Sequence, residues 1–294
     1  MTTTTNLTTQ SLDVPGATLV YDLRRNDAST EPILFLIGLP MAAAGFGTLA
    51  GHFTDRTVMT YDPRGSERST MTDPASTPTT DDHADDLHRL IQAVGGGPVD
   101  MFASSGGAVN ALALVAKHPD HVRTLVAHEP PLSDLLPDRE AASAASQAVY
   151  ETYMRAGFGA GMAHFIALSS HKGPFPDDWA DIPPPDPATF GLPTEDDGSR
   201  DDPLLGQPPD SGSTQYQPDF DAIRSAPTRV VVAAGAESEG ELTHRAAKAV
   251  AERLGMEVVI FPSHHGGFLG GEYGYAGDPD AFAAKLREVL TSSP

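Results

Sequence analysis

The chain has 294 residues, of which 39% are hydrophobic and 20% are charged, a composition typical of a globular protein with a large core. Its 40 acidic and 19 basic residues give a net charge of −21, which disfavours nucleic acids and anionic membranes as partners. The absence of cysteine excludes disulfide bonds, thiol catalysis and thiolate zinc sites.

The first residues of the chain show neither the basic nor the apolar region of a signal peptide. The most apolar segment, residues 33–47, is too short to span a bilayer and is interrupted by Pro40. These features predict a soluble, cytoplasmic protein whose partner is a small-molecule substrate rather than a membrane or a nucleic acid. They leave the oligomeric state open.

Short β-rich apolar segments alternate with helical patterns along most of the chain. The predicted strands cover residues 17–23, 33–37, 58–61, 99–103, 122–127, 229–234 and 257–261. The predicted helices cover residues 81–94, 106–117, 139–168 and 278–290. This alternation predicts an α/β protein with a mostly parallel central sheet and helices on both faces of the sheet.

Residues 133–227 interrupt this alternation. Their first part carries the helical pattern at 139–168, and their second part, residues 172–220, is rich in Pro, Asp and Gly. We interpret residues 133–227 as a cap inserted over the carboxyl edge of the sheet, and residues 1–132 and 228–294 as the core domain. The pattern leaves open whether the Pro-rich part is an ordered wall of the cap or a mobile loop.

A pair of serines stands where the predicted strand 99–103 meets the predicted helix 106–117. In a sharp strand-to-helix turn, the residues two before and two after a nucleophile approach each other, so both must be small. Ser105 meets this rule because its flanking residues are Ala103 and Gly107, whereas Ser104 would place Phe102 in the turn. We therefore predict Ser105 as a nucleophile beside a helix N-terminus that favours negative charge.

The residues around Ser105, together with the Tyr-Asp-Pro-Arg-Gly-Ser turn at 61–66, resemble the centre of the α/β-hydrolase superfamily. The resemblance covers residues 30–134 and 228–291, and it departs from the family where Ala103 replaces the usual Gly. It implies that the catalytic base follows the last strand, which places His265 in that role and His264 beside it. It also implies an oxyanion hole formed by the backbone N–H groups of Gly106 and Leu39.

The acid that should orient the histidine is less clearly marked. Most members of the family carry Asp three residues after the glycine at position 235, and this chain has Ser238 there. Glu237 could serve if the loop were bent differently. Alternatively, Glu129 follows the predicted strand 122–127, where relatives such as the haloalkane dehalogenases place a glutamate. Both Glu129 and Glu237 stay open at this point.

We expect neither a metal nor an organic cofactor. His83 and His88 lie five residues apart on one predicted helix, the wrong spacing for two ligands on one face, and no phosphate-binding glycine motif occurs. The sequence therefore predicts an esterase-like serine hydrolase that cleaves an ester, thioester, lactone or activated amide through an acyl-enzyme. Two alternatives remain: a C–C-cleaving or non-hydrolytic enzyme of this fold, and a catalytically silent protein that binds a small molecule.

Overall fold

The computed structural model describes residues 6–209 and 213–292, and its centre is one mixed β-sheet. Within these residues, nine strands pair in the order β1-β2-β4-β3-β6-β7-β8-β9, with β5 beside β2. The strands are β1 (Asn6–Val14), β2 (Ala17–Arg25), β3 (Leu34–Ile37), β4 (Val58–Tyr61), β5 (Thr70–Met71), β6 (Val99–Ser104), β7 (Val122–His128), β8 (Arg229–Gly235) and β9 (Val259–Phe261).

The sheet is parallel from β4 to β9 and antiparallel at the edge formed by the N-terminal strands. Each of the seven predicted strands is present, so the prediction of a mostly parallel sheet is confirmed. Strand β1 was not predicted, and it pairs with β2 around Gly16. An edge strand of an antiparallel pair can lie largely exposed, so its sequence needs no regular apolar alternation.

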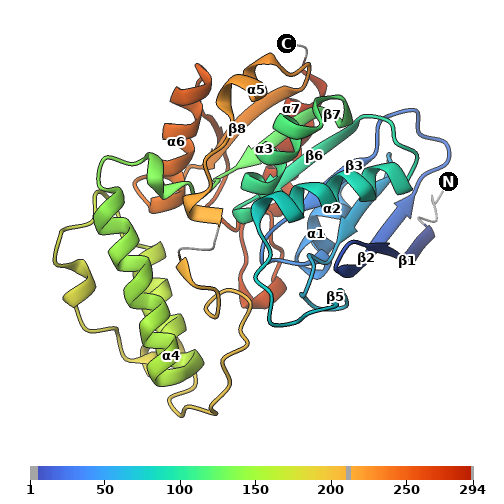
Figure 1. The fold of residues 1–294 in the computed structure, drawn as a ribbon. Helices are drawn as coiled ribbons and strands as arrows, with labels where there is room; N and C mark the ends of the chain where they lie inside the picture. The colour runs from blue at the N-terminus through green and yellow to red at the C-terminus, as the bar shows by residue number, and fades with distance from the viewer. Residues whose placement is uncertain (1–5, 210–212, 293–294) are drawn as a thin grey trace.

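Helices cover both faces of the sheet, as predicted. They are α1 (Gly47–Gly51), α2 (Thr80–Ala93), α3 (Gly106–Lys117), α4 (Arg139–Ser169), α5 (Phe220–Ser225), α6 (Leu242–Leu254) and α7 (Pro279–Thr291). One face packs against α2, α3, α5 and α6 through residues such as Leu87, Leu112 and Val250. The opposite face packs against α1 and α7 through Leu49 and Phe282. In Figure 1, α2 and α3 lie in front of the sheet.

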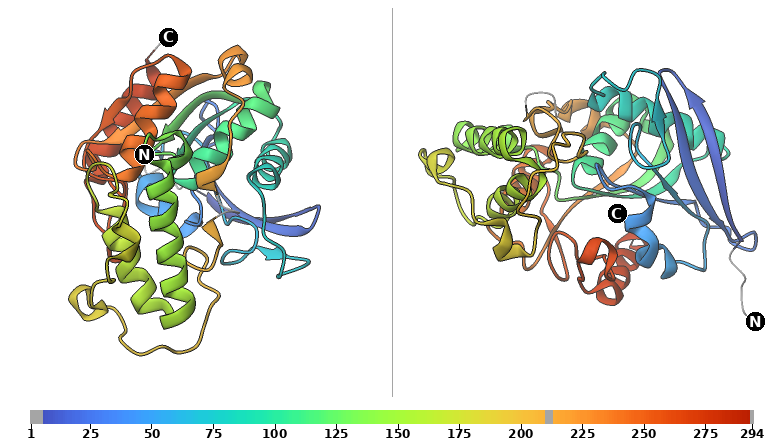
Figure 2. Two further views of the ribbon diagram at one scale, coloured as in Figure 1. Left: turned by 60° about the vertical axis from the view of Figure 1, so that its left-hand side comes forward. Right: turned by 90° about the horizontal axis from the view of Figure 1, so that it is seen from below.

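The segment between β7 and β8 projects to one side of the sheet (Figures 1 and 2). Its main element, α4, is a hairpin of two helices, because Gly157 leaves the helical backbone with φ 79°. The two halves are joined where Thr152 Oγ1 lies 3.0 Å from His164 Nδ1. The described part of the Pro-rich segment packs on this hairpin, with Trp179 buried and stacked on His164.

This projecting segment is fastened to the core by its own apolar cluster and by polar contacts. Leu242 of α6 joins the buried residues of the segment. Asp138 pairs with Arg245 of α6, and the Gly173 N–H donates to the Gly240 carbonyl over 2.8 Å. By contrast, α5 lies in the same stretch of sequence but packs in the core, on the face of the sheet that α2, α3 and α6 cover.

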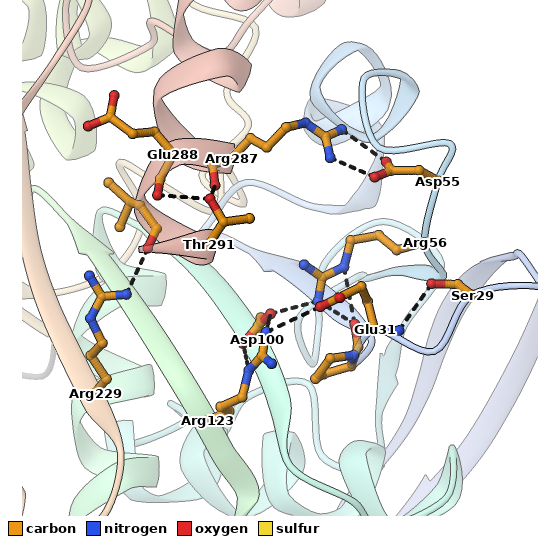
Figure 3. A network of polar contacts seen from close by, with 12 residues as sticks. Ser29, Glu31, Asp55, Arg56, Asp100, Arg123, Arg229, Arg287, Glu288 and Thr291 are labelled. Atoms are coloured by element: carbon orange, nitrogen blue, oxygen red, sulfur yellow. Dashed lines mark hydrogen bonds and ion pairs between the residues drawn. The ribbon is translucent and has the colours of Figure 1, made fainter. Parts of the chain in front are cut away.

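A network of charged groups holds the amino ends of the central strands together (Figure 3). Asp100 of β6 is completely buried and accepts hydrogen bonds from Arg56 over 2.7 Å and from Arg123 over 2.6 and 2.8 Å. Because both guanidinium groups are permanently charged, this carboxylate is neutralised at any pH at which it is ionised.

None of the helices within residues 6–209 and 213–292 combines the length and the apolar character that crossing a bilayer requires.

Candidate active site

Ser105 is the single residue between β6 and α3. Its backbone is left-handed, with φ 57° and ψ −131°, a conformation that a non-glycine residue adopts only where its surroundings hold it. Here the Ser105 N–H donates to the His128 carbonyl at the end of β7 over 3.0 Å. Ser104 is instead buried, with its hydroxyl 3.3 Å from Nδ1 of His128. Of the two serines, Ser105 therefore occupies the strained and partly exposed elbow.

The loop after β3 passes directly against the start of α3. A Cβ added to Gly107 would lie 2.7 Å from the Gly38 Cα, and one added to Gly106 would lie 2.9 Å from the Leu39 carbonyl oxygen. Gly107 must therefore be small, because the backbone of Gly38 approaches it. The structure places Leu39 beside Gly106.

Glu129 directly follows β7, and its carboxylate is completely buried. Its Oε1 accepts hydrogen bonds from the Gly235 N–H over 2.9 Å and from the Ser238 hydroxyl. Its Oε2 accepts one from the Thr243 hydroxyl over 2.8 Å. Its backbone has a φ of 49°, so Glu129, like Ser105, is held in the left-handed region. Donors from β8, from the loop that follows β8 and from α6 thus fix this carboxylate in one orientation.

His265 lies in the loop after β9 and completes the shell around Glu129. Its Nδ1 is 2.5 Å from Glu129 Oε2. An ionised carboxylate can only accept, so Nδ1 carries a proton, and in the neutral imidazole Nε2 is left with a lone pair. The imidazole remains 38% exposed, so it faces the buried acid on one side and solvent on the other. Gly235 allows this loop to pass, since a Cβ there would lie 2.8 Å from the Ser263 carbonyl oxygen.

The two members of this pair change each other's pKa. Burial by itself would raise the pKa of Glu129 and lower the pKa of His265. The hydrogen bond and the charge attraction between them outweigh burial. They hold the pKa of Glu129 well below its usual range and raise the pKa of His265 above 6.5. The pair therefore combines a stable negative charge with an imidazole that readily takes up a proton.

His128 fills the space behind this pair. It is completely buried, and its ring centroid lies 5.9 Å from that of His265. Burial lowers the pKa of His128 to about 4, so this ring is neutral at neutral pH and does not compete for the charge of Glu129. Its Nε2 is without a hydrogen-bond partner among the described residues.

The neighbouring candidates have other partners. His264 uses both ring nitrogens within its own loop: Nδ1 accepts from the Gly266 N–H over 3.0 Å, and Nε2 lies 3.3 Å from the Ala276 carbonyl. Glu237 is exposed, and its backbone carbonyl accepts from Lys172 over 3.2 Å. Of the two predicted acids, the structure therefore brings Glu129 rather than Glu237 to His265.

The structure differs from the predicted site in one contact and in two donors that were not predicted. In the described part of the chain, no hydrogen bond joins the Ser105 hydroxyl to His265, although Ser105 is tied to β7 one residue before Glu129. Sequence reasoning also missed Ser238 and Thr243 as donors to Glu129. Ser238 could have been found, because it stands where the family usually has its acid. Thr243 lies in α6, a helix that was not predicted.

Comparison with known proteins places this arrangement in a family. A family model for the alpha/beta hydrolase fold matches residues 31–269. The chain belongs to the α/β-hydrolase fold family. Among its relatives, the uncharacterized hydrolase YraK of Bacillus subtilis is 30% identical over 272 residues, which cover 88% of this chain and 89% of YraK.

Solved structures of this family resemble the chain over nearly its whole length. A thermophilic esterase from Thermogutta terrifontis matches with a TM-score of 0.61 and 18% identity, covering 96% of this chain and 98% of the esterase. The enol-lactonase from Burkholderia xenovorans matches with a TM-score of 0.63 and 15% identity, covering 96% of this chain and 100% of the lactonase. At these identities the structures establish the α/β-hydrolase fold, while the hydrolase relatives support an α/β-hydrolase enzyme.

Proposed function

We propose that this α/β hydrolase is a serine hydrolase that transfers an acyl group from a small-molecule ester, thioester, lactone or activated amide to water. The observation that carries the proposal is the 2.5 Å contact between His265 Nδ1 and the buried Glu129 Oε2. A carboxylate in this position keeps the proton on Nδ1 and leaves Nε2 as the base. The left-handed backbone of Ser105 supports its role as the nucleophile.

The reaction follows from these positions. The Ser105 hydroxyl attacks the acyl carbon while its proton passes to Nε2 of His265, and the Gly106 and Leu39 N–H groups stabilise the oxyanion. The leaving group departs with the proton from His265, and the acyl group stays on Ser105. A water molecule then gives a proton to the same nitrogen and attacks the acyl carbon. As the bond from Ser105 Oγ to the acyl carbon breaks, His265 returns that proton to Oγ, and the acid is released.

In this proposal the hydrogen bond between Ser105 and His265 has to form when the substrate binds. Catalytic hydrogen bonds are often long in free enzymes and shorten only in the complex with substrate. A change in the Ser105 side-chain rotamer is a small motion compared with moving β7 or the loop after β9. We therefore expect the serine-to-histidine contact to form when an acyl group occupies the site.

The substrate class follows from charge and from relatives. The net charge of −21 disfavours strongly anionic substrates. The similar structures include, by their names, an esterase and an enol-lactonase. Neutral oxygen esters and lactones are therefore the first substrates to test. We also propose that α4 and the Pro-rich segment form a cap that limits the size of the acyl or alcohol part.

A fluorophosphonate probe tests the proposal directly, because it modifies only an activated serine. We expect mass spectrometry to find one adduct on Ser105 in the wild-type protein and none in Ser105→Ala. Hydrolysis of p-nitrophenyl acetate should fall about ten-thousandfold or more in Ser105→Ala. Ser104→Ala is the matched control, and it should keep the adduct.

Two results would contradict the proposal. Folded wild-type protein that does not react would favour a protein that binds a small molecule without turning it over. An adduct that persists in Ser105→Ala would assign the nucleophile to another residue. A series of p-nitrophenyl esters of increasing acyl length would then measure how much room the cap leaves.

A further inference from the structure

Three histidines meet on the face of the sheet that α2 and α3 cover. His88 lies on α2, His118 ends α3, and His121 lies in the short helix η2 (Pro119–His121) that leads into β7. One ring nitrogen from each can be chosen so that all lie within 4.8 Å of one another. The two segments that supply them are separated by 30 positions in the sequence, so only the packing of α2 on α3 creates the group.

Two ring nitrogens of this histidine cluster have no hydrogen-bond partner among the described residues. Nδ1 of His88 and Nδ1 of His121 are buried, and neither has a hydrogen-bond partner among the described residues. The rings of His88 and His118 stack with centroids 3.8 Å apart, and the ring of His121 meets that of His88 edge-on with centroids 4.6 Å apart. Buried polar atoms are nearly always paired in native structures, so these two nitrogens lack the partner that a ligand would supply.

The surrounding charge suits a cation. The Asp85 carboxylate lies 3.7 Å from Nε2 of His118. Two cationic groups lie nearby. Lys117 is paired with Asp85 over 2.9 Å and with Asp81 over 3.7 Å. Arg89 opposes positive charge on His88, while Asp120 favours it on His121. A net charge of −21 adds a general attraction for positive ions.

We propose that His88, His118 and His121 bind one divalent transition metal ion, with zinc as the best match. Neutral imidazoles are preferred ligands of zinc, copper and nickel, and three of them leave a fourth tetrahedral position for water. Zinc-to-nitrogen bonds of about 2.1 Å bring the ligand nitrogens to about 3.4 Å from one another. The rings must therefore turn out of their present contacts, which requires side-chain rotation at the end of α3 and in η2.

This site is separate from the candidate active site. Ser105 precedes α3 and His118 follows it, and a helix of 12 residues is about 18 Å long. A metal at this place does not reach the acyl group. It would connect α2 to the α3–β7 junction and stabilise the folded state by binding to it alone. The expectation of no metal rested on His83 and His88 within one helix, and that spacing carries no information about His118 or His121.

Calorimetric titration of the tag-free, EDTA-treated full chain with zinc chloride tests this site. We expect one equivalent to bind and the melting temperature to rise. His88→Gln and His121→Gln should each weaken zinc binding about tenfold or more. Loss of a residue that only orients a metal ligand already costs about tenfold in affinity, and loss of a ligand should cost at least as much. Both should also lose most of the rise in melting temperature, each measured against its own metal-free value.

A matched control and a second metal complete the test. His52→Gln removes a histidine of similar exposure (30% of its side chain, against 28% for His118) elsewhere on the surface, so it should bind zinc like wild type. Cobalt should give a tetrahedral visible spectrum in wild type that His88→Gln lacks. The proposal is overturned if wild type shows no saturable binding, or if His88→Gln and His121→Gln bind zinc as tightly as wild type.

Discussion

Two completely buried carboxylates lie at opposite ends of the parallel strands, and their partners differ in kind. Asp100, near the amino end of β6, is enclosed by the guanidinium groups of Arg56 and Arg123 (Figure 3). Glu129, at the carboxyl end of β7, is enclosed by two hydroxyl groups, one amide N–H and the imidazole of His265. Burial alone therefore does not distinguish a carboxylate that stabilises the fold from one that we propose takes part in catalysis.

The difference lies in whether the partner can exchange a proton. Arginine stays charged at all accessible pH values, so the Asp100 cluster is a permanent connection between strands. Histidine titrates near neutrality, so the pair formed by Glu129 and His265 can take up and release one proton. The same burial serves stability at one end of the sheet and, in our proposal, catalysis at the other.

Glu129→Gln should have the largest effect and should act on turnover. Glutamine keeps the size of the side chain but loses the charge and favours the wrong tautomer of His265. Hydrolysis of p-nitrophenyl acetate is expected to fall about ten-thousandfold, with the circular dichroism spectrum unchanged. Glu237→Gln is the control and should stay active; an inactive Glu237→Gln beside an active Glu129→Gln would move the acid to Glu237.

Asp100→Asn should act on stability instead. It leaves Arg56, whose side chain is only 6% exposed, without its counter-charge. Urea denaturation should show a free energy of unfolding lower by about 3 kcal/mol. Turnover per fluorophosphonate-reactive site should stay close to wild type. A loss of turnover per site as large as that of Glu129→Gln would remove the distinction between the two ends of the sheet.

A double variant that transfers the carboxylate from position 129 to position 238 tests whether its charge is what matters. Ser238 is completely buried and touches Glu129, and it occupies the position where the family usually has aspartate. Adding Ser238→Asp to Glu129→Gln should recover about a hundredfold of the lost turnover, within the range that a positioned acid–base pair contributes. Ser238→Asn in the same background supplies no charge and should recover nothing; equal recovery by both would show that charge is not the cause.

The pH dependence reports the same pair. Activity requires neutral His265, and Glu129 raises the pKa of that imidazole above 6.5, so the acid limb of kcat/KM should lie above pH 6.5. A raised pKa keeps the imidazole protonated to higher pH, so activity is lost earlier as the pH falls. In Glu129→Gln the residual activity should show a limb at lower pH than in wild type. An unchanged limb would mean that another group controls the profile.

His264→Ala should have the smallest effect, because both ring nitrogens of His264 bind backbone groups of its own loop. We expect turnover to change by less than about threefold, a loss of under about 1 kcal/mol, because a histidine whose ring nitrogens are both occupied does not serve as the base. His265→Ala, measured beside it, should lose activity to the level of Ser105→Ala. Equal losses in the two histidine variants would mean that the base has been misassigned.

Much of the fold was predictable because buried parallel strands and amphipathic helices leave local patterns. The strand at residues 58–61 and the helix at 106–117 have the bounds observed for β4 and α3. The exposed edge strand β1 was not, because its polar Thr residues carry no apolar period. The break of α4 at Gly157 was also missed, because glycine within a helical pattern does not by itself show that the chain turns back.

Local residue patterns were enough to predict the α/β class, the strained serine turn with its small neighbours, and the loop that carries His265, since each depends on residues adjacent in the chain. Which carboxylate meets His265 depends instead on how the strands and helices pack. β7 and β8 are neighbours, so Glu129 and Glu237 start from adjacent strand ends, and the direction of each side chain depends on donors from β8 and α6. The cluster of His88, His118 and His121 exists for the same reason: side chains distant in sequence meet only when helices pack.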